Sequence, residues 1–312
     1  MITLDKSDYP SANIKNHGIL AQIGNTPLIE LTQFFSWKKQ VKIFAKAEWL
    51  NPGGSVKDRA ALLMVTQAIQ DGNLTKGKII LDASSGNTGI GYALVGAALG
   101  YEVMICIPRN ASPERLRLLK VYGAKLVLTD PLEGIDEAIM TARKMKADNP
   151  DLYYYPDQYS NDANWMAHYH TTGKEIWEQT RGRVTHFVAG LGTTGTFTGT
   201  SRFLKSRDPG IQTIALQPDS PFHGLEGLKY METSLIPAIY DSRLVDEMLF
   251  ISSELSQGLT QELARKEGLV VGPSSGAALA GVLQIAERIE KGVIVTVFPD
   301  RGERYLSDRF WE

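Results

Sequence analysis

The chain has 312 residues, 43% hydrophobic and 22% charged, which is typical of a globular protein with about two domains. This composition excludes an intrinsically disordered, collagen-like or coiled-coil chain. Lysine plus arginine number 33 and aspartate plus glutamate 35, so the net charge of -2 lacks the broad basic field of a nucleic-acid-binding protein.

Short apolar runs alternate with longer segments of helical period, which indicates an α/β protein with parallel sheets and helices on both faces. The predicted strands are Val41–Glu48, Lys78–Asp82, Val103–Ile107, Lys125–Leu128, His186–Ala189, Thr213–Gln217 and Val293–Phe298. The predicted helices are Val56–Gln70, Thr88–Leu99, Pro113–Tyr122, Ile135–Ala147, Asn161–Thr180, Thr196–Lys205, Glu254–Glu267 and Ser275–Glu290. The turn-rich stretch 149–164 is the expected domain boundary.

The most membrane-like stretch, Ile90–Pro108, is interrupted at Gly100 and therefore predicts a buried helix, a turn and a buried strand. The polar segment Met1–Pro10 lacks the features of a signal peptide. The single cysteine, Cys106, excludes an intramolecular disulfide and a cysteine-rich metal site, and we expect it to be a small buried hydrophobic residue. We therefore expect a cytoplasmic protein without a membrane or nucleic-acid partner.

The segment Asn51–Arg59 (NPGGSVKDR) places Lys57 at a predicted helix start, in a loop whose glycines let a ligand approach the backbone. The positive end of a helix dipole disfavours the charged form of a lysine, which lowers its pKa toward nucleophilic use. Asp58 and Arg59 are neighbours that can offset this effect. From the spacing alone, a solvated lysine and a Schiff-base lysine both remain open.

Other Gly-rich loops also precede predicted helices. Ser84–Gly89 (SSGNTG) offers hydroxyl groups and free N–H groups, which suit an anion such as a carboxylate. Gly190, Gly192 and Gly195 satisfy the dinucleotide fingerprint, whose implied class is an NAD(P) oxidoreductase. The same loop has three threonine hydroxyls, at 193, 194 and 196, and suits a monophosphate equally well.

Two anion loops and one lysine together fit pyridoxal phosphate chemistry. The lysine would take the aldehyde of the cofactor, one loop its phosphate, and the other loop the carboxylate of an amino acid. An NAD(P) oxidoreductase requires neither the lysine nor the second loop. His168 and His170 point to different faces of a helix, and no metal-binding or nucleophile motif occurs, so we expect no metal.

Five motifs occur in order along the chain: Ile23–Leu28 (IGNTPL), Pro52–Arg59 (PGGSVKDR), Ser84–Gly89 (SSGNTG), Gly192–Thr196 (GTTGT) and Gly272–Gly276 (GPSSG). With these motifs the chain resembles, over essentially its whole length, the cysteine synthase family of fold-type II pyridoxal-phosphate enzymes. The segment Asp300–Ser307 (DRGERYLS) is more similar to the B branch of that family than to the A branch.

The resemblance implies two open, twisted, mostly parallel sheets flanked by helices, as in the β subunit of tryptophan synthase. It further implies a smaller, mobile, substrate-gripping domain at residues 51–160. Residues 1–50 and 161–312 would form a larger domain that binds the phosphate of pyridoxal 5'-phosphate.

The same resemblance implies a role for each residue of the motifs. Lys57 would be the catalytic residue and form the Schiff base, Asn87 would bond the ring oxygen of the cofactor, and Ser274 would face its pyridine nitrogen. The phosphate would lie on Gly192, Thr193, Thr194, Gly195 and Thr196, and the substrate carboxylate on Ser84, Ser85, Thr88 and Gln158. The family often has threonine at the position of Ser84 and isoleucine at that of Pro273, and we expect the proline to shift the loop of Ser274.

The implied reaction is β-replacement, in which a sulfur donor replaces the activated group of O-acetyl-L-serine or O-phospho-L-serine. Sulfide, thiosulfate or a carrier thiocarboxylate would give L-cysteine or S-sulfocysteine. The alternative is a cystathionine β-synthase-like or other pyridoxal-phosphate enzyme of β-replacement or β-elimination. An NAD(P) oxidoreductase and a non-catalytic, partner-binding relative are remoter alternatives. The resemblance also implies a homodimer and allows a sulfur-carrier protein as partner.

A basic residue near the leaving group would let the enzyme discriminate between O-phosphoserine and O-acetylserine. Aligned from Ile236–Asp241, Lys229 lies where B-type members of the family place such a residue. A phosphate leaving group carries close to two negative charges and an acetyl group none, so a cation there favours O-phosphoserine. A lysine is a point charge and gives a softer preference than arginine. The alternative is a solvated loop lysine.

Overall fold

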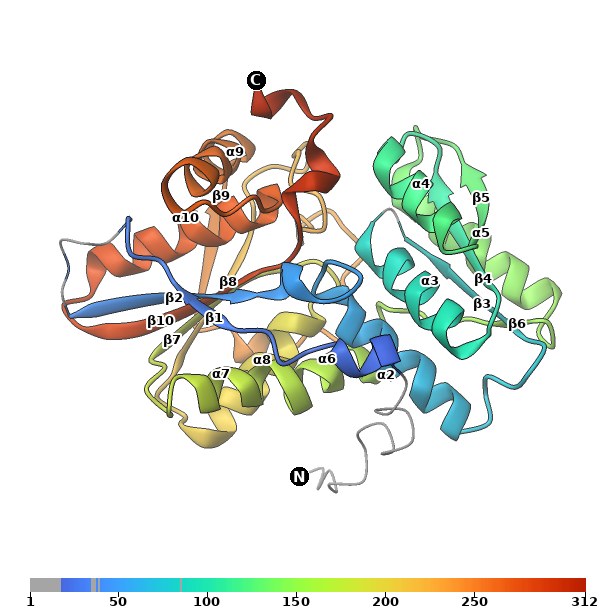
Figure 1. Cartoon of the computed structure of the whole chain (residues 1–312), viewed down its shortest axis with the longest axis horizontal. Coiled ribbons are helices and arrows are strands. Elements are labelled where there is room, and N and C mark those ends of the chain that lie inside the picture. Colours follow the sequence, from blue (N-terminus) through green and yellow to red (C-terminus); the bar gives the residue numbers. More distant parts are fainter. Residues whose placement is uncertain (1–17, 35–37, 39, 85) are drawn as a thin grey trace.

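The computed structural model describes residues 18–34, 38, 40–84 and 86–312, so the predicted site residue Ser85 lies outside the described part. The described residues form two β-sheets, each with helices on both faces (Figure 1). The two halves meet where α2 (Lys57–Gln70) packs against α6 (Asp162–His168). The predicted α/β fold with two mostly parallel sheets is confirmed.

The larger sheet has the strand order β1-β2-β10-β7-β8-β9, and every neighbouring pair except β1 and β2 is parallel. Its central strands are almost entirely apolar because helices cover both faces. The strands are β1 (Leu28–Glu30), β2 (Val41–Ala47), β7 (His186–Gly190), β8 (Gln212–Pro218), β9 (Glu247–Ile251) and β10 (Gly292–Phe298).

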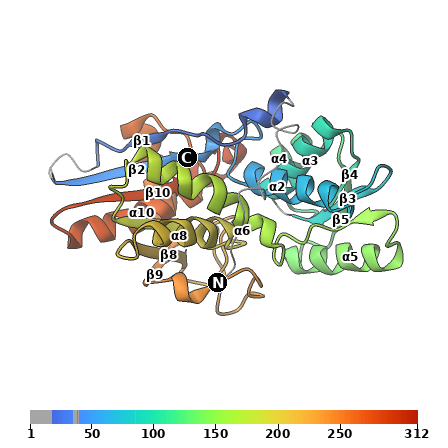
Figure 2. The same cartoon turned by 90° about the horizontal axis from the view of Figure 1, so that it is seen from below.

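Two pairs of helices cover the larger sheet. On one face, α9 (Ser253–Glu262) and α10 (Pro273–Arg288) pack against the strands and form one apolar core. On the other face lie α7 (Lys174–Gln179) and α8 (Gly195–Arg207), with a second core around Phe187 and Phe197. Seen from below, α6 and α8 lie in front of this sheet (Figure 2).

The smaller sheet has the order β5-β4-β3-β6, and all its pairs are parallel. One face packs against α5, and the other against α2, α3 and α4. The strands are β3 (Ile79–Ala83), β4 (Val103–Pro108), β5 (Lys125–Thr129) and β6 (Tyr153–Tyr154). The helices are α3 (Asn87–Leu99), α4 (Pro113–Val121) and α5 (Gly134–Asp148).

The structure differs from the sequence prediction at three strands and at two π-helical turns. The strands β1, β6 and β9 were not predicted, since β1 and β6 have only three and two residues. The predicted helix Asn161–Thr180 is divided by a π-helical turn at Tyr169–Gly173, which separates α6 from α7. A second π-helical turn, Leu263–Glu267, ends the predicted helix Glu254–Glu267. One extra residue in a helical turn leaves the apolar spacing almost unchanged, so the pattern does not reveal it.

The membrane-like stretch Ile90–Pro108 is, as predicted, a helix, a turn and a strand. Gly100 ends α3 in the left-handed conformation, with a φ of 72°, and β4 follows it. Within the described ranges, none of the helices has the length and apolar character needed to cross a membrane. Cys106 is fully buried on β4, as expected of a small hydrophobic residue, and burial raises the pKa of its thiol to about 12.

A buried network of ions anchors the N-terminal half of α2. Arg59 bonds Glu48 through two N–H groups and Glu175 through two more, at 2.6–2.8 Å. Lys46 completes the network with a 2.6 Å contact to Glu175. Burial raises the pKa of the Glu48 carboxyl, but the Arg59 guanidinium outweighs this effect and holds that pKa at about 2. Both acids are therefore ionised and paired at neutral pH.

We expect Arg59→Met to lower the free energy of unfolding by about 3–5 kcal/mol, because it leaves two buried carboxylates without their cation. The matched control is Lys42→Met, which breaks an exposed 3.3 Å pair with Glu30 and should cost less than about 1 kcal/mol. Urea unfolding of both variants measures the difference. Equal, small losses would contradict the structural importance of the network.

Candidate active site

Lys57 is the first residue of α2 and follows a loop in which Gly54 has a positive φ of 78°. The Val56 N–H donates to the carbonyl of Pro299 at 2.8 Å, which ties the start of α2 to the segment after β10. The Lys57 side chain is half-buried. Burial lowers the pKa of its amine, and the charges of Asp300 and Glu48 oppose this in part. The sequence predicts a lowered pKa of Lys57 from the helix dipole, whereas in the structure burial is the main cause of the lowered pKa.

The neighbours of Lys57 in the sequence, Asp58 and Arg59, bond other groups. The Asp58 carboxylate accepts the Gly53 N–H at 2.6 Å, and burial raises the pKa of Asp58 to about 7. Arg59 belongs to the buried ion network. These two side chains therefore have other partners, and neither is among the charges that act on the pKa of Lys57.

The loop between β7 and α8 forms a cradle for an anion. Thr194, just before α8, has a φ of 70°, and its hydroxyl is buried with no hydrogen-bond partner among the described residues. A side chain at Gly192 would collide with the carbonyl of Gly227, and one at Gly195 with the side chain of Asn164. The loop thus combines a helix N-terminus, a free hydroxyl and room that only glycine leaves, which suits a phosphate.

Two adjoining cavities contain most of the predicted site residues. The first is lined by Lys57, Asn87, Gly192, Thr193, Thr194, Thr196, Ser274 and Asp300, among others. The second shares Lys57, Asn87, Gly192 and Thr193 with it and adds Ser84, Thr88, Gln158 and Lys229. Gly195 belongs to the loop but does not line either cavity. The structure therefore gathers the predicted residues around one lysine.

Ser84 shapes the loop between β3 and α3. Its hydroxyl accepts the N–H groups of Gly86 and Gly89, at 3.2 and 3.0 Å. Gln158 is buried, and its amide donates to the carbonyl of Ala83 at 2.9 Å. The first N–H groups of any helix lack partners within it, so the start of α3 beside Thr88 is suited to a carboxylate.

Asn87 has an unexpected environment. Its amide nitrogen donates to Asp300 at 2.6 Å, and its amide oxygen accepts a hydrogen bond from Arg304. Asp300 also accepts from the Tyr305 hydroxyl at 2.7 Å, and its second oxygen is buried without a partner in the described ranges. In the sequence, the segment Asp300–Ser307 indicates the branch of the family but not its place in the site. Pairing of β10 with β2 brings this segment to Lys57.

Ser274 lies in the first turn of α10, after an N-cap at Gly272 and the proline Pro273. Proline at the first helical position fits the helix, because an N–H group at that position would have no intrahelical partner. The Ser274 side chain lines the first cavity together with Lys57. The proline thus begins the helix and leaves Ser274 at the cavity.

Lys229 is half-buried and faces the second cavity. Its backbone N–H donates to the carbonyl of Leu191 at 2.8 Å, and its amine lies 4.9 Å from the centre of the Tyr159 ring. Burial lowers the pKa of this amine, against the opposing charge of Asp136.

His168 was assigned no role from the sequence, yet it supports the anion loop. Its ring is fully buried and contacts the hydroxyls of Thr172 at 2.9 Å and Thr196 at 3.3 Å. Burial, followed by the charge of Arg59, lowers the pKa of His168 to about 3, so the ring is neutral at pH 7. A lone histidine in a helical pattern carries no sequence signal of such a contact.

The residues present fit pyridoxal phosphate. One cavity holds a lysine amine, a phosphate cradle with a free Thr194 hydroxyl, and the Ser274 hydroxyl. Across the described residues, no group of three histidine, cysteine, aspartate or glutamate side chains is placed to hold a metal ion.

Comparisons with known proteins agree with this chemistry. Residues 19–300 match the family of pyridoxal-phosphate dependent enzymes. A cysteine synthase of Aquifex aeolicus is 52% identical over 313 residues, which cover 98% of this chain and 95% of that protein. Cysteine synthase B of Escherichia coli is 41% identical over 285 residues, which cover 91% of this chain and 93% of that protein.

The solved structures include a cysteine synthase of Entamoeba histolytica, which is 37% identical to this chain with a TM-score of 0.90. The match covers 100% of this chain and 94% of that one. The glycine fingerprint at Gly190–Gly195 therefore does not mark an NAD(P) oxidoreductase. The matching family, the identities over nearly full length and the lysine-centred cavity together establish that the chain belongs to the cysteine synthase family of pyridoxal-phosphate-dependent enzymes.

Proposed function

We propose that the protein makes L-cysteine by replacing the β-substituent of an O-activated L-serine with a sulfur nucleophile. The observation that carries this proposal is the position of Lys57, whose half-buried amine lines both the cavity of the phosphate cradle and the cavity beside Ser84 and Thr88. The cysteine synthases that the chain matches support the same reaction class.

Lys57 is the proton-transfer residue of this proposal. Bound pyridoxal phosphate supplies an electron sink for the substrate Cα. A lowered pKa leaves more of the Lys57 amine neutral at pH 7, and a neutral amine accepts a proton. Lys57 would remove the Cα proton before the leaving group departs and return it after sulfur has added.

The other residues bind and orient. Gly192–Thr196 would hold the cofactor phosphate, and the start of α3 with Ser84, Thr88 and Gln158 would hold the substrate carboxylate. Ser274 would face the pyridine nitrogen with a neutral hydroxyl, which makes the ring a weaker electron sink than an aspartate would and favours prompt elimination. Asn87 would bond the ring oxygen once its amide turns from Asp300 and Arg304.

The substrate is O-acetyl-L-serine, and O-phospho-L-serine is accepted beside it because Lys229 faces the substrate cavity. Sulfide or a carrier thiocarboxylate is the sulfur donor that leads to L-cysteine, and thiosulfate as donor gives S-sulfocysteine instead. We further propose a homodimer in the cytoplasm, as the resemblance implies. Residues 51–160 would move as the smaller domain, in accord with the smaller sheet, whose strands all lie between Ile79 and Tyr154.

We expect Lys57→Ala to lose both the visible absorbance of bound cofactor and the formation of cysteine, since the variant lacks the only amine proposed to bond the cofactor. The control is Lys291→Ala, which removes an exposed lysine and should keep both properties. Absorbance spectra and a cysteine assay measure the two effects. Borohydride reduction of the unaltered protein that labels a different lysine would overturn the assignment.

We expect Thr194→Val to weaken binding of pyridoxal phosphate about tenfold to a hundredfold, because a hydrogen bond to a charged phosphate contributes roughly 1.5–3 kcal/mol. Thr198→Val is the matched control, since the Thr198 hydroxyl is also buried without a partner among described residues but lies deeper in α8. Titration of the cofactor-free proteins measures both affinities. Unchanged binding in Thr194→Val would place the phosphate elsewhere.

We expect Lys229→Ala to reduce kcat/KM for O-phosphoserine about tenfold to a hundredfold more than kcat/KM for O-acetylserine, because only the phosphate leaving group carries charge. Steady-state kinetics with sulfide and each serine ester give this ratio. A similar loss for both esters means that Lys229 does not recognise the phosphate.

A further inference from the structure

An ion pair crosses the second cavity between the two halves of the molecule. Arg115 is the third residue of α4, which packs beside the smaller sheet, and one of its terminal nitrogens contacts the Glu226 carboxylate. Glu226 lies in the chain segment that continues to Lys229. The two side chains differ greatly in exposure, with 3% for Arg115 and 50% for Glu226.

The buried guanidinium has donors to spare. Its Nε atom is buried and, as far as the structure describes the chain, has no hydrogen-bond partner. The guanidinium carbon lies over the Tyr305 ring, 4.9 Å from its centre, in a cation–π contact. A guanidinium has five N–H donors in a fixed fork, which matches an oxyanion better than a single carboxylate contact does.

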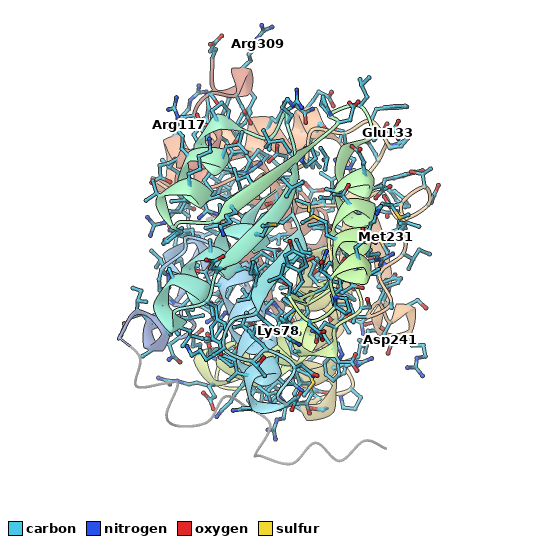
Figure 3. All side chains as sticks on the ribbon, turned by 90° about the vertical axis from the view of Figure 1, so that its right-hand side faces the viewer. Lys78, Arg117, Glu133, Met231, Asp241 and Arg309 are labelled. Carbon is cyan, nitrogen blue, oxygen red and sulfur yellow. The ribbon has the colours of Figure 1, made fainter. Side chains whose placement is uncertain are left out.

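The position of α4 explains how Arg115 reaches the cavity. Viewed from the side of the smaller sheet, α4 with Arg117 lies at the same end of the molecule as the C-terminal turn with Arg309 (Figure 3). A hydrogen bond of 3.2 Å from Ser307 to Glu114 joins these two segments. The Arg115 side chain extends from α4 to the Tyr305 ring. It lines the same cavity as Lys57 and Lys229.

Basic residues outnumber acidic residues in the lining of this cavity. Apart from Lys57, whose amine is assigned to the cofactor, the charged residues that line it are the basic Arg115 and Lys229 and the acidic Glu226. A low-dielectric cleft strengthens such an excess of positive charge. Lys57 serves the cofactor and the Ser84 loop the substrate carboxylate, which leaves Arg115 without a task in the proposed reaction.

We propose that Arg115 is a specificity-determining residue that binds an oxyanion of about two negative charges on a substrate, and that Glu226 occupies this position in the ligand-free chain. The inference rests on the proposed function, whose substrates include two sources of such an anion. One is the phosphate of O-phosphoserine, and the other is an anionic sulfur donor such as thiosulfate. Glu226 is exposed enough to turn into solvent when the anion arrives.

Competition between Glu226 and the anion predicts that substitutions of Arg115 and of Glu226 have opposite effects on anion binding. Removing the arginine deletes the binding group, whereas removing the acid deletes its competitor. If the ion pair only joins α4 to the opposite loop, the two substitutions should have effects of the same sign. Both would then weaken binding, because both break the same contact.

The first experiment measures binding of inorganic phosphate to the holoenzyme by calorimetry. Arg115→Gln should weaken binding about tenfold to a hundredfold, Arg115→Lys should restore part of it, and Glu226→Gln should strengthen it about threefold to tenfold. The control is Glu290→Gln, an equal change of charge beyond the far end of α10, which should leave binding unchanged. Changes of the same sign for Arg115→Gln and Glu226→Gln, or no change in either, would overturn the proposal.

The second experiment identifies the source of the anion. Arg115→Gln should lower the ratio of kcat/KM for O-phosphoserine to that for O-acetylserine, or the ratio for thiosulfate to that for sulfide, and the ratio that falls names the substrate. Both ratios unchanged within twofold would refute a role in specificity. An unaltered holoenzyme that makes no cysteine would instead overturn the proposed function, while phosphate binding would still decide whether Arg115 is an anion receptor.

Discussion

Parallel strands end at a common edge of their sheet, and the geometry of this site depends on that constraint. The neighbouring strands β2, β10 and β7 lead to Lys57, Asp300 and the loop Gly192–Thr196. The carboxyl end of β3 in the smaller sheet contributes Ser84. The hydrogen bond from Val56 to Pro299 fixes the first two of these segments relative to each other. A single lysine can therefore line the cavities of both anion loops.

Burial, more than any single contact, sets the chemistry of the charged groups here. It lowers the pKa of Lys57, Lys229 and His168 and raises that of Asp58. Where opposite charges meet without solvent, as in Arg59 and Glu48, the pair stays ionised instead. The same effect of burial explains why His168 is neutral where its ring contacts the Thr196 hydroxyl.

Much of the fold was predictable because the apolar strands and long helices have clear periods, and most of the predicted site residues line the two cavities that share Lys57. The π-helical turn at Tyr169–Gly173 was not predictable, since it scarcely changes the spacing of apolar residues. Asp300, Arg115 and His168 were also missed. Each acts through a contact with a distant part of the chain, and ordinary charged residues in ordinary helices or turns give no local signal of such contacts.

The central claim is that Lys57, the cofactor and the two anion loops form one site for β-replacement. The most direct test follows the visible absorbance of the purified holoenzyme through one reaction cycle. We expect O-acetylserine to shift the band of the bound cofactor, and sulfide to restore the original band as one equivalent of cysteine appears. A band that does not respond to O-acetylserine, or that sulfide fails to restore, would contradict it.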